Sequence, residues 1–242
     1  MITLLASSPI KESTPDAPFP ALDERNGFIC LLQEFWAPDA RCLMIAADPD
    51  AFDLNDEMTS YYHEAVVRSG LSVSCFDLWD ARYYDPAALH SYDVIFLAGG
   101  HVPTERAWFE FLHLRDLLDC FDGLVIGTSA GSMNAANLVY AWPEREGESL
   151  DPNYELFFPG LGLAECMLLP HYQKVKDVRL DGKLYVREIA CGDSYGHRML
   201  AVPDGSFVLV ADGEEIVFGE AYLVENGTIT PFCTEGEERR FC

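Results

Sequence analysis

The chain has 242 residues, 49% of them hydrophobic and 23% charged, which is enough apolar material to bury the core of a folded domain. Its 16 basic and 40 acidic residues give a formal net charge of −24 at pH 7, which opposes the phosphate contacts that bind nucleic acids and anionic membranes. We therefore expect a single domain over residues 1–242 that binds neither nucleic acid nor membranes.

The eight cysteines are scattered without a closely spaced pair, so the sequence predicts neither a zinc site nor a redox dithiol. Several lie in apolar runs, where a free thiol behaves as a small buried hydrophobe, and this usage suits a reducing cytoplasm. The first apolar stretch is too short for a secretory signal, and no run approaches the ~18 apolar residues of a membrane-spanning helix. We expect a cytoplasmic protein without a metal or other cofactor.

Residues 7–26 contain four prolines among serines and acidic residues, a composition typical of irregular chain. We therefore expect 1–40 to be a partly irregular N-terminal segment. The regular pattern begins at 41–49, a short apolar run ended by Asp and Pro, which predicts a strand buried on both faces. A helix should follow, capped by Asn55 and ended by Gly70.

Two more strands are predicted at 71–79 and at 93–100, the second ending in a pair of glycines. Between 103 and 120, polar and apolar residues alternate with the helical period, and Glu105 falls among the polar positions. Residues 123–140 then predict a strand, a tight turn and a helix. Strands that alternate with helices are typical of a doubly wound α/β fold, whose mostly parallel sheet has helices on both faces.

The pattern becomes less regular after residue 141. Residues 142–153 predict an exposed loop, and 165–171 predict a short strand. Residues 206–232 are interrupted by an Asp-Gly and an Asn-Gly dipeptide, which favour β-hairpins. We expect these hairpins to add C-terminal antiparallel strands to the sheet, followed by a solvated acidic tail.

The clearest chemical motif is a GxSxG segment centred on Ser129, between the strand and the helix predicted at 123–140. Its glycines, Gly127 and Gly131, allow the chain to turn sharply between the two elements. In that context the Ser129 hydroxyl should project at the carboxyl edge of the sheet, where an α/β protein binds its substrate. The motif therefore predicts a serine nucleophile.

A serine hydroxyl needs an adjacent base near neutral pH, normally a histidine that a carboxylate orients. Two of the six histidines suit this role: His171, at the end of the strand predicted at 165–171, and His197, in a polar segment. His101 follows the glycine pair and could line a substrate pocket. The others lie on helix faces or in a loop: His63, His90 and His113.

An acyl-transfer site also needs two N–H donors for the oxyanion that forms in the transition state. The Ala130 N–H follows the nucleophile directly at a helix N-terminus. The turn at Gly99 and Gly100 could supply the second donor, because glycine lets the backbone approach a substrate closely.

Four short motifs carry a resemblance to a known family: LAGG at 97–100, IGTSAGSMN at 126–134, GLGL at 160–163 and PHY at 170–172. Together they resemble the dipeptidase E and cyanophycinase family of serine peptidases, which belongs to the class I glutamine amidotransferase-like superfamily. The resemblance covers about residues 40 to 230.

The resemblance implies a role for each of five residues. Ser129 would be the nucleophile and His171 the base, while the Gly100 and Ala130 amides would form the oxyanion hole. The family's acidic residue lies in a segment similar to AVPDGSFVLV, which implies Asp204 as the third member of a catalytic triad. The resemblance thus implies a peptidase that cleaves a peptide or isopeptide bond through an acyl-enzyme.

Substrate recognition is less well defined by the motifs. The family's dipeptidases bind an N-terminal aspartyl residue through cationic groups, which makes Arg179 and Arg187 candidates for substrate binding beside Gly99 and His101. However, His101 stands where many relatives have Asn or Asp, and a net charge of −24 does not attract acidic substrates over long range. We expect a small peptide as the partner. A homodimer is one of the oligomeric states that the sequence allows.

Three alternatives remain open at this stage. An α/β-hydrolase esterase would use Ser129, then Asp177 or Asp181, then His197, in that chain order. A glutamine amidotransferase is disfavoured, because that chemistry uses a cysteine at the position of Ser129. The third alternative is a non-catalytic binding module that keeps the turn as a structural relic.

Overall fold

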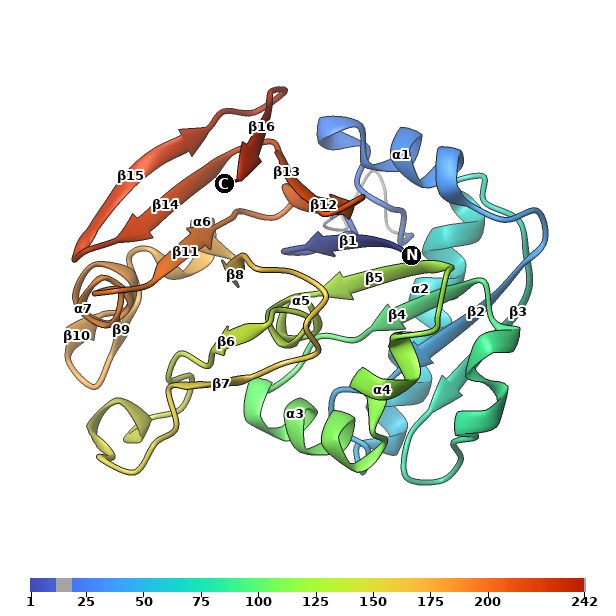
Figure 1. The fold of residues 1–242 in the computed structure, drawn as a ribbon, viewed down its shortest axis with the longest axis horizontal. Coiled ribbons are helices and arrows are strands. Elements are labelled where there is room, and N and C mark those ends of the chain that lie inside the picture. Colours follow the sequence, from blue (N-terminus) through green and yellow to red (C-terminus); the bar gives the residue numbers. More distant parts are fainter. Residues whose placement is uncertain (12–18, 242) are drawn as a thin grey trace.

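The structure, a computed structural model that describes residues 1–11 and 19–241, is built on an eight-stranded central sheet (Figure 1). In spatial order the strands are β16 (Glu238–Phe241), β13 (Glu214–Phe218), β12 (Phe207–Ala211), β1 (Ile2–Ala6), β5 (Leu124–Thr128), β4 (Val94–Leu97), β2 (Ala40–Ile45) and β3 (Val73–Trp79). In this order, neighbouring strands from β1 to β3 are parallel to each other, and neighbouring strands from β16 to β1 are antiparallel.

Helices cover both faces of this sheet, because its strands alternate their apolar side chains between two cores. Leu4 faces the core under α1 (Phe28–Phe35) and α2 (Phe52–Arg68). The next residue, Leu5, faces the core under α3 (Val102–Phe111) and α4 (Leu114–Leu118). The predicted doubly wound α/β class is therefore confirmed.

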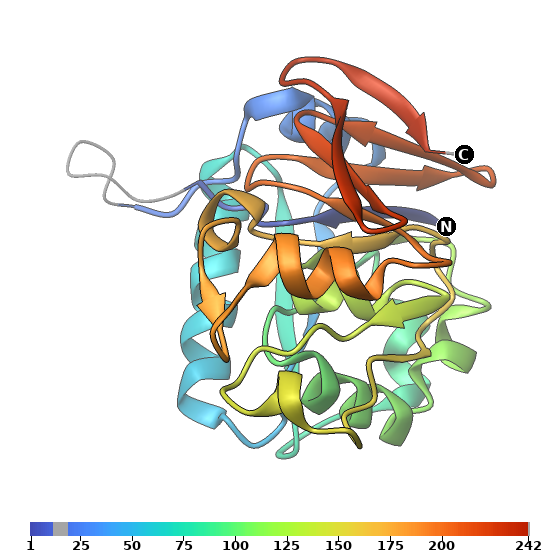
Figure 2. The same ribbon diagram turned by 90° about the vertical axis from the view of Figure 1, so that its left-hand side faces the viewer.

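A second sheet packs beyond the carboxyl ends of the parallel strands (Figure 1). In the turned view the C-terminal strands of both sheets, in red, lie at one end of the molecule, away from α2 in cyan (Figure 2). Its order is β15 (Thr228–Cys233), β14 (Ala221–Glu225), β11 (Arg198–Ala201) and β8 (Met167–Leu169). The remaining elements are short: α5 (Ala130–Asn134), α6 (Tyr172–Val175), α7 (Cys191–Asp193), the π-helical segment Tyr185–Ala190, the 3-10 turns Arg25–Gly27, Pro86–Ser91 and Glu148–Leu150, and the pairs β6 (Leu138–Tyr140) with β7 (Phe157–Pro159) and β9 (Arg179–Leu180) with β10 (Lys183–Leu184).

The predicted C-terminal hairpins are present. Asp212 and Gly213, with φ of 52° and 76°, join β12 to β13, and Asn226 and Gly227, with φ of 49° and 80°, join β14 to β15. Positive φ at both turn positions is the geometry that these dipeptides favour. The two hairpins belong to different sheets, because the chain crosses from the central sheet to the second sheet after β13.

Two predicted helices differ from the observed ones near the site. The segment 103–120 is interrupted at His113, whose left-handed conformation (φ 52°) lets the buried side chains of Leu112 and Leu114 both face the core. The helix predicted after Ser129 ends at Asn134, and the residues that follow form β6. Tertiary pairing of β6 with β7 overrides the helical pattern there.

Two further predictions need correction. Asn55 does not cap α2, which begins at Phe52; the Asn55 amide donates instead to the Asp48 carbonyl. The N-terminal segment is more regular than expected, because β1 is an inner strand of the central sheet. The acidic tail is exposed, as predicted, and it includes the edge strand β16. In the described part of the chain, every helix is too short or too polar to cross a membrane.

Candidate active site

Ser129 lies in a sharp turn between β5 and α5, with φ 50° and ψ −113°. Such backbone angles cost about 1–3 kcal/mol for a residue with a side chain and are found mostly at functional sites. The Ser129 N–H and the Ser132 hydroxyl hold the turn, because both donate to the Ala6 carbonyl, at 3.1 and 2.8 Å. The turn therefore places the hydroxyl at the carboxyl edge of the central sheet.

The two glycines of the GxSxG segment are required by close packing. A Cβ at Gly127 would lie 2.9 Å from the Ser132 Cα, and one at Gly131 would lie 2.4 Å from the Leu97 carbonyl oxygen. Both distances are shorter than a normal contact, and both involve backbone that cannot move aside. The glycines thus let α5 pack directly on the ends of β4 and β5.

His171 reaches the serine from the second sheet. It follows β8 in a left-handed conformation (φ 58°), and its Nε2 lies 3.0 Å from Ser129 Oγ. The His171 backbone N–H donates to Ser7 Oγ at 2.7 Å, which fixes the turn that carries the ring. The side chain is 30% exposed, so a substrate can approach it.

Asp204, between β11 and β12, completes the arrangement. Its Oδ1 lies 2.6 Å from His171 Nδ1 and accepts the Ser7 hydroxyl at 2.7 Å. Its Oδ2 lies 2.7 Å from Lys174 Nζ. Burial acts to raise the pKa of Asp204, but the hydrogen bonds from His171, Lys174 and Ser7 outweigh it and hold that pKa well below the ordinary value. The carboxylate is therefore ionised throughout the neutral range.

The ionised carboxylate fixes the tautomer of the neutral histidine. Because Asp204 can only accept, the proton of His171 lies on Nδ1 and the lone pair of Nε2 faces Ser129 Oγ. The serine hydroxyl then donates to Nε2. A hydroxyl, an imidazole and a carboxylate bonded in this sequence can perform nucleophilic acyl transfer.

Among residues 1–11 and 19–241, no group of three or more His, Cys, Asp and Glu side chains is arranged to hold a metal ion.

The glycine turn after β4 lies against the serine. A Cβ at Gly99 would be 3.2 Å from the Ser129 Cβ, and one at Gly100 would be 2.5 Å from the Ala47 Cβ. Within the described ranges, the Gly100 and Ala130 N–H groups have no hydrogen-bond partner in the protein. Both amides are therefore available to a bound group.

His101 lies at the start of α3, where its Nδ1 is 2.8 Å from Thr104 Oγ1. Its Nε2 is 3.6 Å from Glu148 Oε1, in the loop predicted at 142–153. Burial, followed by the charge of Arg145, lowers the pKa of His101. The ring is thus neutral at pH 7, and the loop contacts the residue that follows the glycine turn.

The same loop brings charged groups to the site that the sequence did not single out. The Glu148 side chain accepts the backbone N–H groups of Glu144 and Arg145, at 2.8 and 2.9 Å. Burial raises the pKa of Glu144 to about 7, and the hydrogen bond from Trp142 acts against this rise; Glu144 also lies close enough to His171 for an imidazolium there to lower that pKa. The site therefore has a rim of mixed charge close to the histidine.

The two candidate arginines lie farther along the chain and are exposed. Arg179, in β9, donates to the Gly182 carbonyl at 2.8 Å and pairs with Glu188 at 3.6 Å. Burial raises the pKa of Tyr172, the residue after His171, and the charge of Arg187 opposes that rise. The structure thus brings Arg187 near the histidine turn and engages Arg179 within its own hairpin.

His197 does not meet Ser129. Its ring stacks on Phe157 at a centroid distance of 4.1 Å, before the amino end of β11. His171 follows the carboxyl end of the parallel neighbour β8, so the two histidines lie at opposite ends of this strand pair. The carboxylate of Asp181 is bonded to the loop residue Ser149. The arrangement required by an α/β-hydrolase is therefore absent among these described side chains.

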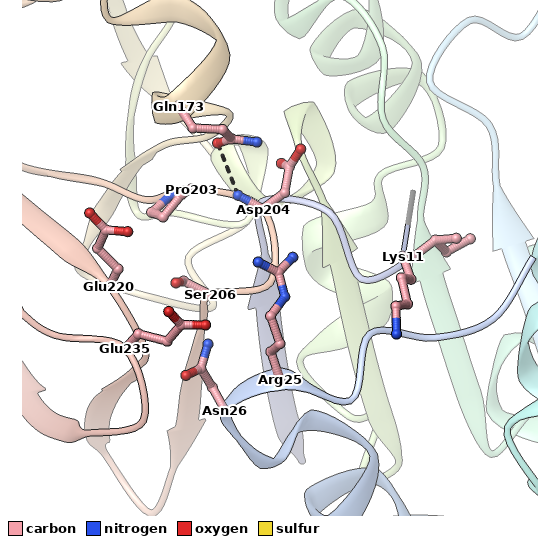
Figure 3. Close-up of a pocket in the computed structure, with 10 residues that line it drawn as sticks. Lys11, Arg25, Asn26, Gln173, Pro203, Asp204, Ser206, Glu220 and Glu235 are labelled. Atoms are coloured by element: carbon pink, nitrogen blue, oxygen red, sulfur yellow. Dashed lines mark hydrogen bonds between the residues drawn. The ribbon is translucent and has the colours of Figure 1, made fainter. Parts of the chain in front are cut away.

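Residues around Asp204 include several that the sequence reasoning missed. Gln173 Oε1 accepts the Asp204 N–H at 3.1 Å, at the edge of a cavity of about 430 Å³ behind the carboxylate (Figure 3). Arg25, bonded to Asp23, lies under Gly205, where a Cβ would be 2.5 Å from the guanidinium carbon. Polar residues within one helical turn after a candidate base, such as Gln173 and Lys174 here, are a signal that could have been used.

Ser7 was missed for a different reason. It follows the apolar run ITLLA, which the prolines further along led us to treat as part of an irregular segment. Had that run been read as a strand buried on both faces, Ser7 would have fallen at the carboxyl edge of the sheet, beside Ser129.

The comparisons with known proteins support the fold. No family profile matches the sequence, and no curated protein matches it. A solved structure does match, that of a protein from Listeria monocytogenes EGD-e provisionally named as a peptidase E, with a TM-score of 0.50 and 15% sequence identity. The match covers 96% of this chain and 97% of the other. The chain therefore has a peptidase E-like fold.

Proposed function

We propose that this protein is a serine-dependent hydrolase that cleaves a peptide or isopeptide bond in a small substrate. The observation that carries the proposal is the position of His171, with Nε2 3.0 Å from Ser129 Oγ and Nδ1 2.6 Å from Asp204 Oδ1. The peptidase E-like fold adds support for a peptidase over other acyl-transfer enzymes. Fold likeness alone would not define the chemistry, whereas this hydrogen-bonded chain does favour it.

In the acylation step, Ser129 Oγ attacks the substrate carbonyl carbon and its proton passes to His171 Nε2. The imidazolium that forms is stabilised by the Asp204 carboxylate, which stays ionised because its pKa is lowered. The carbonyl oxygen becomes an oxyanion and accepts hydrogen bonds from the Gly100 and Ala130 N–H groups. The C–N bond then breaks, and His171 returns the proton to the leaving amine.

In the deacylation step, a water molecule replaces the amine. His171 takes a proton from the water as its oxygen attacks the acyl carbon, and a second oxyanion forms in the same place. The ester bond to Ser129 Oγ breaks, and His171 returns the proton to that oxygen. The products are a carboxylic acid and the free serine, so the cycle needs only water.

A reducing compartment is part of the proposal. All seven cysteines in the described residues are free, and Cys42 and Cys166 are fully buried. Burial raises the pKa of both thiols, which makes them poor nucleophiles at neutral pH. We propose that the protein works in the cytoplasm, as its cysteine usage indicates.

Labelling with a fluorophosphonate between pH 6 and 9 tests this function directly. We expect wild-type protein to be labelled, Ser129→Ala not at all, and His171→Ala at least 10³-fold more slowly. His197→Ala is the matched control and should be labelled at the wild-type rate. A folded wild-type protein that resists labelling would overturn the proposal, and so would full activity in His171→Ala. Aspartyl, β-aspartyl and neutral dipeptides then define the substrate.

A further inference from the structure

A buried polar contact joins the two helices on either side of the candidate site. Asn134, at the end of α5, donates from Nδ2 to Glu105 Oε2 at 2.7 Å and to the Val102 carbonyl at 3.1 Å. Glu105 and Val102 lie in the first turn of α3, and all three residues are at most 1% exposed. The sequence pattern placed Glu105 on a polar helix face, so its burial is unexpected.

Stability does not explain this contact. Glu105 Oε1 and Asn134 Oδ1 have no hydrogen-bond partner in the described part of the chain. Burial raises the pKa of Glu105 well above its ordinary value, so burial disfavours the charged form of this carboxyl. A well-packed apolar pair would fill the same space without the cost of burying unsatisfied polar atoms. The contact therefore requires a reason other than stability.

The position of the two helices suggests that reason. α3 begins directly after the turn that contains Gly100, and α5 begins with Ala130. Close to the site, the Gly131 N–H donates to the Ala98 carbonyl at 3.1 Å. Farther from the site, the bonds from Asn134 attach α5 to α3, so α5 is joined to the segment from Ala98 to Glu105 at two places. Two attachments fix both the distance and the rotation between the segments that carry the two amides.

We propose that the contact between Glu105 and Asn134 sets the spacing of the Gly100 and Ala130 amides, so that Glu105 is a positioning residue for the reaction. This inference rests on the proposed function. An oxyanion hole works because its donors are fixed before the charge develops, and a misplacement of 1 Å can cost roughly 10²-fold in rate. A hydrogen bond to the first turn of α3 has the directionality that an apolar contact lacks.

Three variants test the proposal against a merely structural role. Glu105→Gln keeps the shape and an acceptor for Asn134, whereas Glu105→Ala removes both. The double variant Glu105→Met with Asn134→Leu replaces the polar pair by apolar side chains and keeps the core filled. Phe109→Leu, a buried change on the same helix, is the control for general destabilisation. The measurements are the fluorophosphonate labelling rate, kcat and KM on a cleaved peptide, and Tm.

We expect Glu105→Gln to stay within ~3-fold of the wild-type labelling rate. Glu105→Ala and the double variant should lose about 100-fold in labelling rate and kcat, with KM changed less than ~3-fold. The double variant should keep or raise Tm, and Phe109→Leu should lower Tm without slowing the reaction.

If Glu105→Ala or the folded double variant is labelled at the full wild-type rate, this inference fails and the proposed function stands. The same is true of Phe109→Leu if it slows the reaction as much as Glu105→Ala does. If wild-type protein shows no labelling that depends on Ser129, the proposed function fails and the inference fails with it.

Discussion

Asp204→Asn is the most informative single change, because the surrounding groups determine how the new amide must sit. The Lys174 ammonium lies 2.7 Å from Oδ2 and can only donate, so it selects the amide oxygen for that position. The amide NH2 then occupies the position of Oδ1, 2.6 Å from His171 Nδ1, and the Ser7 hydroxyl, which donates to Oδ1 in the wild type, rotates to accept from the amide. Two donors cannot face each other there, so Nδ1 must become an acceptor and the ring proton must move to Nε2.

The histidine would then present a proton to Ser129 instead of a lone pair. It could no longer act as a base, although the contacts of the site would otherwise be kept. We expect kcat/KM to fall roughly 10⁴-fold, which corresponds to about 5 kcal/mol of transition-state stabilisation. The assay is peptide hydrolysis, supported by the fluorophosphonate labelling rate, with Tm as the measure of folding.

Lys174 provides the matched control. Lys174→Met alone leaves the carboxylate of Asp204 in place and should cost less than ~10-fold, as expected for a half-exposed ion pair. Combined with Asp204→Asn, it lets the amide turn its oxygen toward His171 and should recover at least ~10-fold of the lost rate. A loss below tenfold in Asp204→Asn, or no recovery in the double variant, would refute this reasoning about the tautomer.

Three further predictions concern stability. Gly131→Ala places a Cβ 2.4 Å from the Leu97 carbonyl oxygen and should cost about 3 kcal/mol, whereas Gly192→Ala, with open space around it, should leave Tm unchanged; equal Tm values in the two variants would contradict the packing argument. The pKa of Asp204 is lowered by folding, so its contribution is complete above about pH 5 and is lost as the pH falls further; the Tm gap between wild type and Asp204→Asn should narrow from pH 7 to pH 3.5, and a constant gap would argue against it. The pKa of Glu105 is raised by folding, so the free energy of unfolding of wild type should fall relative to that of Glu105→Gln by up to about 1.4 kcal/mol per pH unit as the pH rises above the unfolded pKa. Denaturant titrations of both proteins at pH 4.5 and 7.5 measure this difference, and equal differences at the two pH values would contradict the prediction.

Local sequence signals predicted those parts of the fold in which one dipeptide or one short run determines the backbone. Asp-Gly and Asn-Gly produced hairpins because few other residues accept positive φ at both turn positions. The GxSxG segment indicated a strand, a turn and a helix, and this is what Leu124 to Asn134 form. In both cases the decisive interactions lie within a few residues of each other.

Features that depend on distant partners could not be predicted. After Asn134 the chain forms the strand β6 instead of continuing the helix, because β6 pairs with Phe157–Pro159, about twenty positions later. Glu105 has a polar side chain in an amphipathic pattern, and its burial follows from the packing of α5 against α3, where Asn134 bonds to it. Ser7 lies 197 positions from Asp204, so no local pattern could connect the two. Long-range contacts of this kind are set by topology and not by periodicity.

The three residues that bond in sequence at the site come from different layers. Ser129 belongs to the central sheet, His171 to the second sheet, and Asp204 to the connection that crosses from one to the other. Any slippage between those layers lengthens the bonds among them well before either layer melts. On gradual warming, turnover should therefore be lost at a lower temperature than the circular dichroism signal. The rate of catalysis would then report on the packing of the two sheets against each other more sensitively than the secondary structure does.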